Sequence, residues 1–109
     1  MKGVPTSSEL KRVEIVVESR ELPTVVDLID RAGATGYTVI PHVHGKGHRG
    51  VRADLGFSDV LKNVMVIVIA PDAVARKIVD AVSRLLERRA GLVCVTPVEA
   101  CYSIDKERR

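Results

Sequence analysis

The most apolar run of the chain, residues 62–70 (KNVMVIVIA), limits the available folds more than any other feature. This run is rich in β-branched side chains and ends at Pro71, which predicts a strand buried on both faces. Such a strand needs other secondary structure to cover it. The chain has 109 residues, which predicts a single domain around one core.

Before the apolar run, the sequence predicts a strand, a helix and a second strand. Residues 11–18 (KRVEIVVE) nearly alternate, as in a half-buried strand. A helix is predicted to start within residues 21–24, where Pro23 is tolerated in a first turn, and Gly33 and Gly36 mark its end. Residues 37–44 (YTVIPHVH) are strand-like, and Pro41 should lie at an edge or a bulge because it cannot donate to a ladder. The apolar stripe expected on this helix is Leu22, Val25, Val26, Ile29 and Ala32.

The second half repeats the order strand, helix, strand, with the apolar run as its first strand. A helix is predicted from Pro71 to about Arg88, followed by a short strand over 91–95 and a final extended piece over 97–104. The stripe expected on this helix is Val74, Ile78, Ala81, Val82 and Leu85. The order β-α-β-β-α-β predicts an α+β, ferredoxin-like fold, an antiparallel sheet with two helices on one face.

The predicted sheet carries more apolar side chains than one helical layer can cover. These residues include Val16, Val39, Val43, Val66 and Val68. We therefore expect the face without helices to be buried against another subunit.

Composition and charge exclude several classes of protein. Lys and Arg total 17 against 14 Asp and Glu, a net charge of +3, and the two signs are interspersed, which argues against nucleic-acid binding. No apolar run approaches the ~18 residues of a membrane span. Residues 1–10 are polar and are expected to form a flexible segment rather than a secretory signal, and residues 105–109 a charged tail. We expect a cytoplasmic protein with Cys94 and Cys101 reduced, and Cys94 packed inward on its strand.

Four motifs, in chain order, resemble the PII signalling superfamily. They are residues 36–39 (GYTV), residues 43–47 (VHGKG), the strand over 62–70 with its following helix, and residues 91–99 (GLVCVTPVE). The resemblance implies a PII-like domain over 11–104 that assembles as a homotrimer. It also implies that adenine nucleotides bind in clefts between subunits. A long loop, the T-loop, would span about residues 45–59 and contact partner proteins.

The sequence departs from the nitrogen regulators of that superfamily. Residues 47–59 contain no tyrosine, so the uridylylation of some nitrogen regulators should be absent. Leu92 and Ser103 stand where the family often has a phosphate-binding lysine and an arginine. The short loop and its glycine-rich start are most similar to the carboxysome-associated PII-like proteins, which bind ADP or AMP with bicarbonate.

The similarity to those proteins implies a sensor, not an enzyme, that requires no cofactor. Its ligands would be ADP, AMP or ATP together with bicarbonate. Its protein partner would act in inorganic-carbon uptake or carboxysome function, and a bicarbonate transporter is the candidate. Neither nucleic-acid binding nor direct membrane insertion is expected.

The resemblance also implies a set of site residues. The nucleotide-binding residues would be Gly36, Tyr37, Thr38, Gly45, Lys46, Gly47, His48, Lys62, Arg88, Arg89 and Gly91, and the bicarbonate-binding residues Gly45, Lys46, Gly47 and Arg49. Glycines let a backbone approach an anion closely, and an arginine fork pairs two oxygens at once. We expect Arg88 or Arg89 to replace the lysine missing at Leu92. The alternatives left open are a solvated loop and two cations at a helix C-terminus.

Two other functions compete with this interpretation. His42, His44 and His48 suggest a metal-binding trimer of the divalent-cation tolerance type, since strand alternation places His42 and His44 on one side. No carboxylate or cysteine nearby completes that set. An RNA-binding module of this fold would need exposed aromatics on its central strands. The aromatic residues of the chain are Tyr37, Phe57 and Tyr102. No nucleophile–base pair or carboxylate dyad indicates an enzyme.

Overall fold

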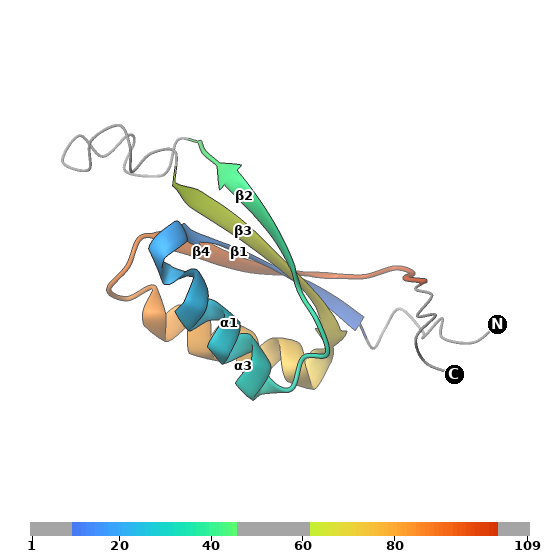
Figure 1. The fold of residues 1–109 in the computed structure, drawn as a ribbon. Helices are drawn as coiled ribbons and strands as arrows, with labels where there is room; N and C mark the ends of the chain where they lie inside the picture. The colour runs from blue at the N-terminus through green and yellow to red at the C-terminus, as the bar shows by residue number, and fades with distance from the viewer. Residues whose placement is uncertain (1–9, 46–61, 103–109) are drawn as a thin grey trace.

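The computed structural model describes residues 10–45 and 62–102, which fold into a sheet covered on one face by two helices (Figure 1). In chain order the elements are β1 (Leu10–Glu18), the 3-10 helix η2 (Ser19–Glu21), α1 (Leu22–Ala32), β2 (Thr38–Val43), β3 (Asn63–Pro71), α3 (Asp72–Leu85) and β4 (Gly91–Pro97). The strands pair in the order β2-β3-β1-β4, and every pairing is antiparallel. The predicted ferredoxin-like βαββαβ fold is confirmed.

The core lies between the two helices and the face of the sheet that they cover. Strands β1 and β3 bury alternate residues, as the period of two requires. The buried apolar residues are Val13, Ile15, Val17, Val64, Val66, Val68 and Ala70 from the strands, and Val25, Ile29, Ala32, Ala75, Ile78 and Val82 from the helices. Each fully buried branched side chain contributes roughly 1.5–3 kcal/mol. This packing holds the connections at the ends of the sheet in defined positions.

Helix α1 matches its predicted bounds, whereas α3 is shorter than predicted. Helix α1 ends at Gly33, which takes the left-handed conformation with φ 98°. Helix α3 ends at Leu85 rather than near Arg88, because the Arg88 N–H bonds to the Leu85 carbonyl at 3.1 Å in a tighter, 3-10-type turn. The buried stripe predicted for α3 includes Ala81 and not Ala75. In the structure Ala75 is buried and Ala81 is half-buried. No helix in the described ranges is both long and apolar enough to cross a membrane.

Strand β2 is an edge strand with an irregularity at Pro41, as predicted. The pairing register with β3 shifts between Pro41 and Val43, and His42 within this bulge has a positive φ of 59°. The bulge interrupts the strand alternation, and His44 follows the last strand residue. Strand alternation therefore no longer supports the prediction that His42 and His44 point to the same side.

The outer strands differ slightly from their predicted bounds. Strand β1 begins at Leu10, one residue earlier than predicted, and β4 continues to Pro97. Beyond it, the Val98 N–H bonds to the Leu10 carbonyl at 3.2 Å, but residues 98–102 are not a strand. The expected final extended piece therefore joins the sheet only at its start, through Pro97 and Val98.

The face opposite the helices carries a row of apolar side chains, which includes Val16 from the set named above. Val66 and Val68 are fully buried beneath the helices, and Val39 packs against the same core. The cross-strand register instead places Ile40, Met65, Val16 and Leu92 in one row across the open face. In the single chain, Ile40 is 41% exposed and Leu92 50%. The expected uncovered apolar face is present.

Cys94 also lies on this open face. It pairs with Glu14 of β1 and is exposed. The prediction that Cys94 packs inward is wrong, because Val93 and Val95 lie opposite the buried residues Ile15 and Val13.

Candidate functional site

Several segments that are distant in sequence meet at one end of the sheet. The register pairs Val17 with Gly91 and Glu18 with Asn63, and Val43 near the end of β2 also lies opposite Asn63. The end of β2, the start of β3 and the α3–β4 connection therefore share this end (Figure 1). We call this end of the sheet the basic end. The predicted site residues that lie there are Gly45, Lys62, Arg88, Arg89 and Gly91.

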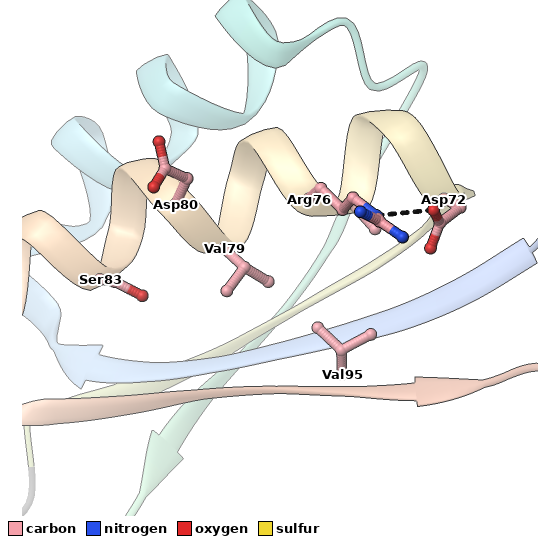
Figure 2. A pocket seen from close by; sticks show the side chains of 7 residues that line it. Asp72, Arg76, Val79, Asp80, Ser83 and Val95 are labelled. Carbon is pink, nitrogen blue, oxygen red and sulfur yellow. Dashed lines mark hydrogen bonds and ion pairs between the residues drawn. The ribbon is translucent and has the colours of Figure 1, made fainter.

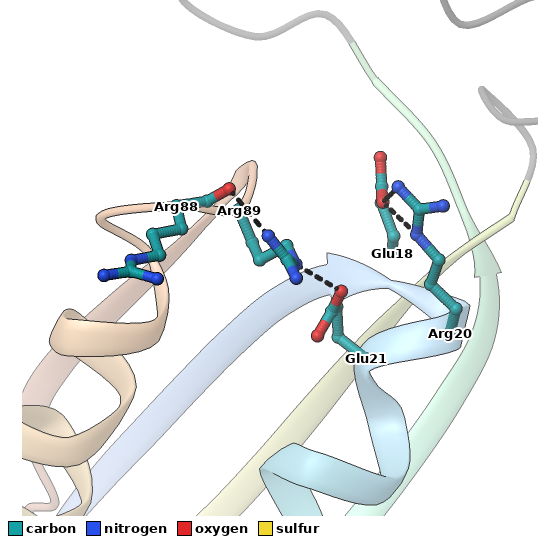
Figure 3. Close-up of polar contacts among 5 residues, drawn as sticks. All are labelled: Glu18, Arg20, Glu21, Arg88 and Arg89. Carbon is teal, nitrogen blue, oxygen red and sulfur yellow. Dashed lines mark hydrogen bonds and ion pairs between the residues drawn. The ribbon is translucent and has the colours of Figure 1, made fainter.

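Arg89 is held by an ion pair that the sequence did not reveal (Figure 3). Its Nε donates to Oε2 of Glu21 at 2.9 Å, and its Nη1 donates to the carbonyl oxygen of Arg88 at 3.2 Å. The Glu21 side chain is only 11% exposed, whereas that of Arg89 is 49% exposed. The two residues are 68 positions apart, so no local pattern pairs them. Arg89 is thus occupied by a buried carboxylate.

The neighbouring Arg88 is exposed and its side chain is available. Within residues 10–45 and 62–102, its guanidinium takes part in no hydrogen bond or ion pair. Figure 3 shows it directed away from the Arg89–Glu21 pair. An arginine with unoccupied donors can bind two oxygens of a phosphate or carbonate group. Of the two arginines predicted for this role, Arg88 is the one whose guanidinium is unpaired among the described residues.

Gly91 is packed so closely against β1 that no other residue fits. It has φ +155°, and an added Cβ would collide with the backbone oxygen of Val16. The same atom would lie 2.9 Å from Cδ2 of Leu86 and 3.2 Å from Cγ1 of Val17. The first of these contacts is with backbone, which no rotamer change relieves. Gly91 therefore fixes the point at which the α3–β4 connection joins the sheet.

Lys62 is exposed and its backbone is tied to the connection after β1. Its carbonyl oxygen accepts the N–H of Ser19 at 2.6 Å, which extends the β1–β3 pairing into η2. Arg20, the next residue of η2, bonds through Nε to Oε1 of Glu18 at 2.9 Å (Figure 3). The short helix η2 thus contacts Lys62 through Ser19 and Arg89 through Glu21.

The residues predicted to line the adenine lie away from the basic end. Gly36, Tyr37 and Thr38 are exposed, and Thr38 pairs with Ile67, in the middle of β3. They belong to the β2 edge of the sheet, whereas Gly91 begins the opposite edge strand, β4. A cleft that contains both groups has to form between two chains, with the β2 edge of one beside the β4 edge of the other.

Four predicted site residues fall outside the described ranges. They are Lys46, Gly47, His48 and Arg49. Among the residues that are described, no three of His, Cys, Asp and Glu gather closely enough to hold a metal ion. Strands β1 and β3, the central pair, carry no aromatic residue.

A groove of about 390 Å³ lies between α3 and β4, away from the predicted site (Figure 2). It is lined by Asp72, Ala75, Arg76, Val79, Asp80, Ser83 and Val95. The guanidinium of Arg76 in this groove is already paired, because its Nε donates to Oδ2 of Asp72 at 2.7 Å. With two carboxylates and one paired arginine, the groove does not favour a phosphate, unlike the basic end.

The comparisons with known proteins point to one family. Residues 10–108 match the model of the family described as nitrogen regulatory protein P-II. A GlnB-like protein of the nitrogen fixation nifHD region of Methanothermobacter marburgensis is 24% identical over 98 residues, which cover 87% of this chain and 93% of the relative.

Two solved structures are also similar. CPII from Thiomonas intermedia K12, a nitrogen regulatory PII-like protein bound to ADP, AMP and bicarbonate, superposes with a TM-score of 0.72 at 28% identity, covering 88% of this chain and 89% of the other. The apo form of the same protein superposes with a TM-score of 0.69 at 26% identity, covering 88% of this chain and 92% of the other.

Proposed function

The chain belongs to the nitrogen regulatory protein P-II family, and on that premise we propose that this PII-like regulatory protein binds ADP or AMP together with bicarbonate. The ligands occupy clefts between the subunits of a homotrimer. The observation that carries the proposal is the distribution of the two groups of site residues over opposite edges of the sheet. CPII, which resembles this chain over most of its length, was solved with these three ligands bound.

Within each cleft, the basic end supplies the anion-binding groups. Arg88 offers a free planar fork to the phosphates, and Lys62 adds a point charge from the start of β3. Gly45 contributes backbone that can approach a small anion closely, and residues 46–49 complete the bicarbonate site. Residues 36–38 of the neighbouring subunit lie against the adenine.

The open face of the sheet forms the interior of the trimer. The row formed by Ile40, Met65, Val16 and Leu92 leaves apolar side chains exposed in the single chain. Burying such side chains between subunits contributes roughly 25 cal/mol for each Å² removed from water. Assembly through this face leaves both helices on the outside.

The protein partner belongs to inorganic-carbon uptake or carboxysome function, with a bicarbonate transporter as the first candidate. Residues 45–59 form the contact surface, and ligand binding changes the affinity for the partner. Copurification of the transporter in the presence and absence of ADP and bicarbonate tests this. Equal recovery under all conditions contradicts ligand control.

Isothermal titration calorimetry of the protein with AMP, ADP and ATP, each with and without bicarbonate, tests the ligand proposal. Binding of ADP or AMP that strengthens with bicarbonate supports it, because the two ligands then share a positive coupling free energy. Binding that bicarbonate does not change removes bicarbonate from the proposal. Absence of binding to all three nucleotides contradicts the nucleotide site itself.

A further inference from the structure

The geometry points to Glu21 as a positioning residue of the anion site. Given the nucleotide binding proposed above, on which this assignment rests, we propose that the buried Glu21 carboxylate acts through Arg89. It fixes the α3–β4 turn, residues 86–90, so that Arg88 faces the phosphates. Arg88 then contacts the anion, and Arg89 does not.

The burial of Glu21 keeps Arg89 in place. Glu21 is the charged residue that the described part of the chain buries, with 9% of its surface exposed, and Arg89 is its ion-pair partner. A buried carboxylate that loses its partner carries a large desolvation penalty. If Arg89 turned to a phosphate, Glu21 would be left in that state. The ion pair therefore opposes a rotation of the Arg89 guanidinium away from Glu21 towards a phosphate.

The Arg89 guanidinium joins the carboxylate to the backbone of the turn. Nε contacts Glu21 at 2.9 Å while Nη1 contacts the Arg88 carbonyl oxygen at 3.2 Å. The turn is fixed a second time at Gly91, which only glycine can occupy beside Val16. Two fixed points this close in sequence restrict the backbone between them, while the Arg88 side chain stays unpaired among residues 10–45 and 62–102.

The same short helix also sets the position of Lys62. In η2, the Ser19 N–H bonds to the Lys62 carbonyl at 2.6 Å, and Glu21, two residues later, holds Arg89. One three-residue helix thus carries the contacts that place Lys62 and the α3–β4 turn. A group that binds a phosphate needs its cations in fixed relative positions, since each lost degree of freedom lowers the cost of binding.

Charge alone predicts the opposite outcome from the positioning role, which makes the test decisive. Glu21→Gln removes a negative charge close to the anion site, so simple electrostatics would strengthen ADP binding. If Glu21 positions the turn, the same variant weakens it. The matched control is Asp27→Asn, the same charge change in an exposed pair with Arg31 on α1.

Calorimetry with ADP and with adenosine separates phosphate binding from adenine binding. We expect Arg88→Ala to lower the ADP affinity about tenfold and Glu21→Gln about fivefold, with adenosine unchanged and Asp27→Asn like the wild type. The double variant, with Glu21→Gln and Arg88→Ala, should bind ADP no more weakly than Arg88→Ala alone. Both changes act on the same interaction, that of Arg88 with the phosphates. The positioning role is overturned if Glu21→Gln binds ADP as tightly as the wild type. It is also overturned if the affinity loss of the double variant equals the product of the two single losses.

Hydrogen exchange followed by NMR in the protein without nucleotide gives an independent readout. The amides of Arg89 and Ala90 should exchange faster in Glu21→Gln and unchanged in Asp27→Asn. Should Glu21→Gln fail to fold, Arg89→Lys is the second variant, because an ammonium cannot span the carboxylate and the Arg88 carbonyl as a guanidinium does. Exchange equal to that of the wild type contradicts the inference. Absence of ADP binding to the wild type contradicts the proposed function alone.

Discussion

Replacing Gly91 by alanine should lower the free energy of unfolding by about 3 kcal/mol. The added Cβ meets the Val16 backbone oxygen and lies 2.9 Å from Cδ2 of Leu86, at a φ of +155° that side chains rarely adopt. The leucine can move, but the carbonyl cannot move without disturbing the β1–β4 pairing. For a domain of this size, a loss of that order lowers the melting temperature by about 15 °C.

The matched control is Gly36→Ala, because nothing lies within 4 Å of a Cβ added there. That variant should change the free energy of unfolding by less than about 1 kcal/mol. Both variants and the wild type are unfolded with urea and by heating, at one fixed protein concentration. If Gly91→Ala is as stable as Gly36→Ala, the α3–β4 connection does not join β1 as closely as described.

Three further changes test other parts of the fold. Ile78→Ala removes a fully buried side chain and should cost about 3 kcal/mol of unfolding free energy in a urea titration; a loss below 1 kcal/mol contradicts its place in the core. Gly33→Ala should cost only about 1 kcal/mol, because φ is 98° but the nearest atom to the new Cβ, in Val74, is 3.9 Å away; a loss as large as that of Ile78→Ala speaks against this. Leu92→Asp places a charge in the apolar row of the open face and should give a folded monomer by light scattering and circular dichroism; an unchanged trimer rules out that face as the subunit interface.

Much of the fold could be predicted because its signals are local. The apolar run over 62–70, the break at Gly33 and the proline in residues 37–44 each act on their own neighbours. They set the element order, and the bulge at Pro41 follows from a missing donor. The same local rules misplaced the end of α3, since its last turn tightens on the way to Gly91.

The faces of the sheet and the contacts of the site depend on long-range register. A strand with apolar residues at nearly every position, such as β3, gives no sign of which alternate set faces the helices. The sequence therefore could not assign Val66 and Val68 to the core face, on which both are fully buried. Glu21 was not singled out either, because its role depends on Arg89, far along the chain. Similarity to the family indicated which arginines to consider, and only the ion pair separates Arg88 from Arg89.

The placement of β2 and β4 on opposite edges of the sheet has a genetic consequence. Each chain of a cyclic trimer would lend its β2 edge to one cleft and its β4 edge to the next. A chain defective only at residues 36–38 and a chain defective only at Arg88 would each be inactive alone. Mixed together, they would rebuild one intact cleft in every mixed trimer. Two inactive alleles of such a protein should therefore complement each other when expressed in the same cell.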